Sequence, residues 1–113
     1  MSKAATRVTL GAAFAGMSMN LRVRLDGAGA FGTADLWQTP TDVTYAVLAL
    51  PRWQDQARAY LAWVREQRAA ELDGKSPAAR LAAQRDVKHQ RHAIGHLWRL
   101  AEKGGGRLVF YAA

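Results

Sequence analysis

Two long helical patterns joined by a short connection constrain the fold of this chain more than any other feature. Apolar side chains recur at spacings of three and four along residues 52–72, the period of an amphipathic helix; they are Trp53, Ala57, Tyr60, Leu61 and Val64. A second pattern runs from about residue 77 to residue 103, roughly 40 Å if it is unbroken. Gly95 interrupts it at a cost of about 1 kcal/mol and marks a close contact or a kink. Because only about five residues join the two patterns, we expect an antiparallel helical hairpin.

A hydroxyl residue followed by proline marks two helix starts. Ser76 precedes Pro77 at the start of the longest helix. Thr39 precedes Pro40 at the start of a shorter helix, and Pro51 either ends that helix or opens the next one. In each case we expect the hydroxyl to cap the helix and the proline to take the first helical position.

Strand patterns lie on both sides of the helical region. Residues 20–25 alternate apolar and basic side chains, as a half-buried strand does. Residues 26–29 signal a turn, after which residues 30–37 can return as a second strand. Residues 6–10 can form another short strand. Residues 107–111 have the β-branched and aromatic content of a final strand, which most simply pairs with the first. The sequence therefore predicts an α+β fold, a small antiparallel sheet packed on a helical hairpin with one extra short helix.

The first residues are set apart from this domain. Residues 1–18 combine a charged start with a mildly apolar segment that polar residues and glycines interrupt, so they match a signal peptide only loosely. Met17 and Met19 are candidates for an alternative translation start. We expect residues 19–113 to form the single domain and residues 1–18 to be an arm or a flexible segment.

Composition excludes several classes of protein. The chain has no cysteine, which removes disulfides, thiolate zinc sites and cysteine nucleophiles. No apolar run reaches the roughly 18–20 residues that a membrane-spanning helix needs. We therefore expect no membrane association and a cytoplasmic location, with which the absence of cysteine is compatible.

The net charge of +7 is concentrated in the second half of the chain. Residues 51–113 carry twelve basic and six acidic side chains, whereas residues 1–50 carry four and three. Such a balance favours an anionic partner. A partner that recognises charge would therefore contact the helical half.

One face of the longest predicted helix gathers all three histidines and four cations. Helical residues advance by 100° each, so seven side chains fall within an arc of about 100°. We call these seven the basic face: Arg85, Lys88, His89, His92, His96, Arg99 and Lys103. The apolar side chains of the same helix gather on the opposite side, so we expect the basic face to lie in solvent.

Metal binding and catalysis are weaker interpretations of this face. His89, His92 and His96 have a spacing at which imidazoles can converge on zinc or nickel. The neighbouring cations oppose a dication, however, and Asp86 is the only close carboxylate to orient an imidazole. A solvent-facing helix offers no evident pocket, and no glycine-rich phosphate loop is present. We predict no metal, no cofactor and no catalytic residues.

Binding of an anionic partner is the interpretation we favour over a solvated face without a partner. DNA or RNA is the first choice, because cations at helical spacing can follow a phosphate backbone; protonated histidine would add charge below about pH 6.5. The second choice is that this chain is an accessory, assembly or inhibitor protein that docks on an acidic surface of a larger protein. Its size and composition suit a protein encoded by a phage or mobile element. Trp63 is its possible interface anchor, unless it packs against the first helix or the N-terminal arm. The oligomeric state stays open.

Overall fold

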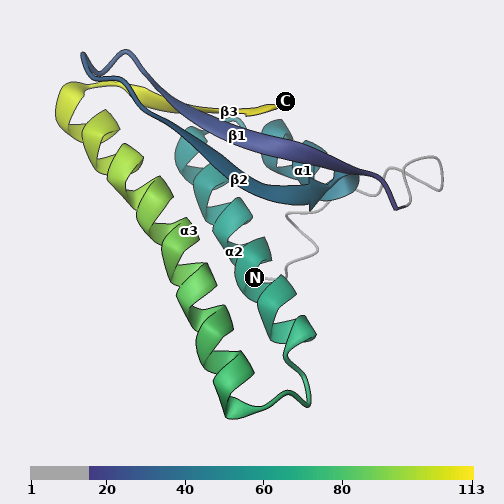
Figure 1. Ribbon diagram of the computed structural model, residues 1–113. Helices are drawn as coiled ribbons and strands as arrows, with labels where there is room; N and C mark the ends of the chain where they lie inside the picture. The colour runs from purple at the N-terminus through teal and green to yellow at the C-terminus, as the bar shows by residue number, and fades with distance from the viewer. Residues whose placement is uncertain (1–15) are drawn as a thin grey trace.

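The six secondary-structure elements follow the predicted order. A computed structural model of the chain describes residues 16–113. Its elements are β1 (Ser18–Asp26), β2 (Thr33–Pro40), α1 (Thr41–Ala49), α2 (Trp53–Glu71), α3 (Pro77–Gly104) and β3 (Arg107–Ala112) (Figure 1). The predicted α+β fold is confirmed. The possible strand at residues 6–10 lies outside the described residues. No helix among residues 16–113 is long and apolar enough to cross a bilayer.

β1 is the central strand of a three-stranded antiparallel sheet with the order β2-β1-β3. Val23 of β1 lies opposite Ala34 of β2 and Phe110 of β3. Alternate side chains of β1 point to opposite faces of the sheet, so Val23 is buried while Arg22 and Arg24 are exposed. The helices cover the apolar face, and α2 and α3 descend from it in Figure 1. The final strand therefore pairs with the first, as the sequence predicts.

The core joins the covered face of the sheet to α2 and α3 through Tyr60, whose side chain is fully buried. The register between β1 and β2 shifts by one residue here, because Leu36 and Trp37 of β2 lie opposite the single residue Leu21 of β1, as in a β-bulge. The Tyr60 hydroxyl accepts a hydrogen bond from the Trp37 backbone N–H at 2.9 Å and donates one to Gln90 Oε1 at 2.8 Å. Burial raises the pKa of Tyr60, although the bond from Trp37 opposes this in part. The hydroxyl therefore stays protonated and links β2, α2 and α3.

The far parts of α2 and α3 project beyond the sheet, as Figure 1 shows. No residue of α2 after Val64 is buried, and Ala83 is the only buried residue of α3 before Ile94. Near the sheet the two helices are packed together, with the rings of Trp53 and Trp98 meeting edge-on at 4.8 Å between centroids. The hairpin is thus fixed at the sheet and exposed at its tip.

One of the two predicted caps is wrong. Pro40 is the N-cap of α1, and no side chain caps that helix. Pairing of β2 with β1 continues through Pro40, so Thr39 belongs to the strand, is buried, and donates its hydroxyl to the Trp37 carbonyl at 2.7 Å. The cap of α3 is confirmed, because Ser76 Oγ accepts a hydrogen bond from the Ala79 backbone N–H at 3.3 Å.

Candidate functional site

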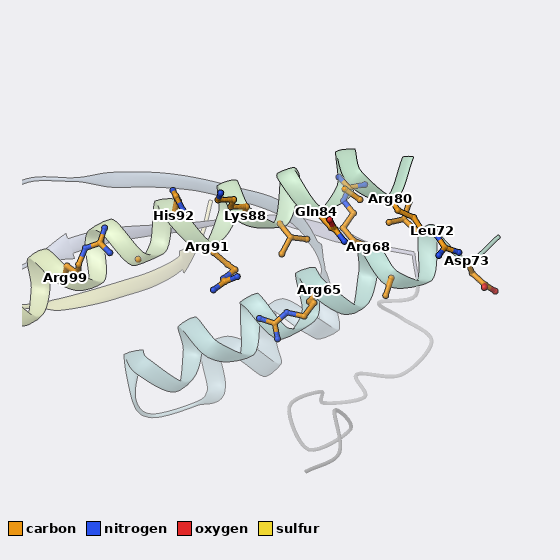
Figure 2. Close-up of a pocket in the computed structure, with 14 residues that line it drawn as sticks. Arg65, Arg68, Leu72, Asp73, Arg80, Gln84, Lys88, Arg91, His92 and Arg99 are labelled. Carbon is orange, nitrogen blue, oxygen red and sulfur yellow. The ribbon is translucent and has the colours of Figure 1, made fainter. Parts of the chain in front are cut away.

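A groove of about 1030 Å³ runs between the projecting parts of α2 and α3. Six of its fourteen lining residues are arginine or lysine, and one, Asp73, is acidic. The six cations are Arg65, Arg68, Arg80, Lys88, Arg91 and Arg99. In Figure 2, Arg91 points from α3 toward α2, the helix that carries Arg65. We call this site the basic groove.

The lining between the cations is apolar and small. Ala69 and Leu72 of α2 and Ala83 and Val87 of α3 contribute to it. Gly95 also lines the groove; α3 remains helical through it, and a methyl group there would meet no atom within 4 Å. Neither a break in the helix nor a close contact therefore explains this glycine. The groove combines a charged surface with an apolar one.

Arg68 differs from the other cations because acidic neighbours already compensate its charge. Its guanidinium lies 4.4 Å from the centroid of the Trp37 ring and forms ion pairs with Glu71 at 2.6 Å and Asp86 at 3.3 Å. A hydrogen bond from Gln67, together with Arg68, lowers the pKa of Glu71 and favours its charged form. Arg68 thus links α2 to the sheet and to α3, and it stabilises the walls of the groove.

The other five cations of the groove have no ion-pair partner among residues 16–113. Within the described part of the chain, no ion pair involves Arg65, Arg80, Lys88, Arg91 or Arg99. Like charges gathered along a concave surface raise the local concentration of anions, because the low-dielectric walls focus the field. The basic groove is therefore suited to a polyanion.

The seven residues of the basic face are all exposed, and they divide between two surfaces. Lys88, His92 and Arg99 line the basic groove. The other four lie on the outer side of α3 and do not line it: Arg85, His89, His96 and Lys103. The predicted face thus borders the groove and shares one edge with it.

Reasoning from α3 alone missed four cations of the groove: Arg65, Arg68, Arg80 and Arg91. Arg91 lies about 160° from His89 around the helix, among positions assigned to the apolar side. Arg65 and Arg68 belong to α2, whereas the predicted basic face lies on α3 alone. The available signal was the hairpin itself, because antiparallel helices bring arginines on both sides of the turn close together.

Metal-ligating side chains do not cluster in the described structure. Across residues 16–113 no group of three histidine, aspartate or glutamate side chains is placed to hold a metal ion. Of the three histidines, only His92 lines the groove, whereas His89 and His96 lie outside it. The polar chemistry of the groove therefore comes mainly from the guanidinium and ammonium groups of its arginines and lysine.

Trp63 is half-buried, whereas an interface anchor was expected to be exposed. Its ring centroid lies 6.1 Å from that of Tyr60, and the side chain packs against the core. Part of it lines a smaller hollow of about 360 Å³, together with Trp37 and Pro40. Much of the ring is thus already engaged within the fold, and its role as an interface anchor stays a prediction.

Comparison with known proteins adds no functional information. No protein-family model matches the chain, and neither the curated proteins nor the solved structures include a match. The geometry of the groove is the basis for functional inference.

Proposed function

We propose that this protein binds DNA or RNA without catalysing a reaction. The basic groove and the adjoining basic face would hold the phosphate backbone. The observation that carries the proposal is the set of five groove cations that form no ion pair within residues 16–113. Four of the five are arginines, whose planar guanidinium can bind phosphate through two parallel hydrogen bonds.

Salt dependence is the signature of this mode of binding. Each phosphate that a cation neutralises releases condensed counterions, so affinity falls as salt rises. Five phosphate contacts predict a loss of about 100-fold to 500-fold between about 50 and 200 mM salt. Contacts of this kind are independent of sequence, so we expect little discrimination between sequences of the same form.

Fluorescence anisotropy with labelled single- and double-stranded DNA and RNA tests the proposal. The wild-type protein should bind at about 50 mM salt and lose affinity steeply toward about 200 mM. The groove variant carries Lys88→Glu and Arg91→Glu, two exposed positions of α3. It should lose most of the affinity, because each substitution replaces attraction to phosphate with repulsion.

A control variant with the same change in net charge separates the groove from the overall charge. It carries Arg24→Glu on the open face of the sheet and Arg52→Glu before α2, both exposed and outside the groove. We expect it to retain most of the affinity. Equal losses in the groove and control variants would show that net charge, rather than the groove, governs binding. No binding by the wild type at about 50 mM salt would refute the proposal.

An acidic protein segment is the second candidate partner, because the groove has an apolar lining as well as cations. Apolar side chains from both helices also line it: Ala69, Leu72, Ala83 and Val87. An amphipathic helix with acidic flanks can dock in a groove of this composition. Such a complex should tolerate salt better than a phosphate complex does. In either case we expect the partner in the cytoplasm.

A further inference from the structure

Phe31 is far more exposed than the other large apolar residues on the described surface. Its side chain is 89% exposed, whereas Leu81, Met17 and Tyr45 are exposed by 55%, 53% and 45%. It lies in the connection between β1 and β2, where its neighbours are glycine and alanine. A ring in this position contributes little to the core, so its face is open to a partner.

The connection that carries Phe31 is held against the end of α3. A methyl group at Gly104 would overlap the backbone of Ala28, and one at Gly106 would lie 2.8 Å from the Ala28 nitrogen. Only glycine at both positions permits this close approach. The other end is fixed by a hydrogen bond from the Leu25 backbone N–H to the Gly32 carbonyl at 2.9 Å. Phe31 is thus presented by a short connection fixed at both ends, which reduces the entropy lost on binding.

This connection borders the basic face on the side away from the groove. A methyl group at Gly32 would lie 2.7 Å from Leu97 Cδ2, so the connection passes directly over that side chain. Helical geometry places Leu97 about 100° from His96 and about 120° from Lys103 around α3. The groove lies on the opposite border, where it is lined by Arg99. Around α3, the groove, the basic face and the connection that carries Phe31 therefore follow one another.

We propose that Phe31 stacks on an unpaired base of single-stranded DNA or RNA whose phosphates cross the basic face. This inference rests on the proposed function and narrows it to single strands. A single strand offers an exposed base face to an aromatic ring, whereas a duplex keeps its bases stacked on one another. Stacking needs no particular base, so it adds affinity without sequence preference.

A single ring suits a base better than it suits a lipid surface. Binding to a membrane interface depends on the apolar area buried, and it usually draws on several large side chains. The connection between β1 and β2 offers only Phe31 among glycines and alanines. One base, in contrast, is covered by one aromatic ring.

The test compares a labelled single strand of about 15 deoxythymidines with a duplex of the same length, within the site size of single-strand binding folds. Phe31→Ala should weaken binding to the single strand by about 5- to 100-fold and leave duplex binding unchanged. Phe31→Trp should retain or strengthen single-strand binding, because indole also stacks. Leu81→Ala is the matched control, since it removes a large exposed side chain near the other end of α3. It should change neither affinity.

Each outcome assigns or removes the role of Phe31. Single-strand affinity equal to wild type in Phe31→Ala, or an equal loss on the duplex, overturns the stacking proposal. If stacking fails in this way while the groove variant still loses affinity for the same strands, the proposed function stands and only the role of Phe31 is refuted. Wild-type protein that binds neither form refutes both. Phe31-dependent binding to anionic phosphatidylserine vesicles, with unchanged single-strand affinity, would assign the ring to a membrane and overturn the proposal.

Discussion

Replacing Tyr60 with phenylalanine tests how the fold supports the groove. The ring stays in place and only the hydroxyl is lost. In wild type this hydroxyl accepts from the Trp37 N–H at 2.9 Å and donates to Gln90 at 2.8 Å. The register shift between β1 and β2 falls at Trp37 itself, so regular strand pairing supplies no replacement there. We predict that Tyr60→Phe leaves the Trp37 N–H without a partner.

The expected loss of stability in Tyr60→Phe comes from the unpaired Trp37 N–H. An unsatisfied buried donor costs about 1–3 kcal/mol. Gln90 is half-buried and can turn toward water, so its lost bond adds little. We therefore expect the free energy of unfolding to fall by about 1–3 kcal/mol. For a domain of this size each kcal/mol lowers Tm by about 4–8 °C.

Stability in alkali supplies a second measurement at the same residue. Burial raises the folded-state pKa of Tyr60 above its ordinary value of 10.0. In alkali the folded state therefore keeps a proton that the unfolded state releases. The contribution of the Tyr60 hydroxyl to the free energy of unfolding is fully present below pH 10.0 and is lost as the pH rises above it. The loss is at most about 1.4 kcal/mol per pH unit, and Tyr60→Phe should abolish that part of the slope.

Urea denaturation at neutral pH and above pH 10.0 measures both effects. The control is Tyr111→Phe, a half-exposed tyrosine of β3 that should lose no more than about 0.5 kcal/mol. An equal loss in the two variants, or a loss below about 0.5 kcal/mol in Tyr60→Phe, would refute the role given to the hydroxyl.

Three further predictions concern α3. Gly95→Ala should raise the free energy of unfolding by about 1 kcal/mol in thermal denaturation, because the added methyl meets no atom within 4 Å in an uninterrupted helix. Gly104→Ala should lower it by about 1–3 kcal/mol, because the methyl would overlap the Ala28 backbone; a neutral result would mean that the contact yields easily. The double variant Arg85→Glu and Lys103→Glu, both outside the groove, should weaken nucleic-acid binding less than the groove variant does in anisotropy. The reverse order would place the phosphates on the outer side of α3.

Much of the local structure could be predicted because it depends on the spacing of apolar side chains and on the residues that start or end an element. Alternation in β1 predicted which side chains are buried, and Ser76 predicted the start of α3. The prediction for Thr39 failed because strand pairing with β1 competes with helix capping. Local propensity for a cap does not include the hydrogen bonds that a neighbouring strand offers.

The sequence by itself determined the elements, their order, the hairpin and the exposure of the basic face, since these follow from which side chains share one face of one element. Only the tertiary structure decided that Arg65 of α2 and Arg91 of α3 line one groove, and that Tyr60 joins β2 to both helices. It also decided that the connection carrying Phe31 lies beside the end of α3. The physical reason is that periodicity describes each element separately, whereas the distance between side chains on different elements depends on how the whole core packs.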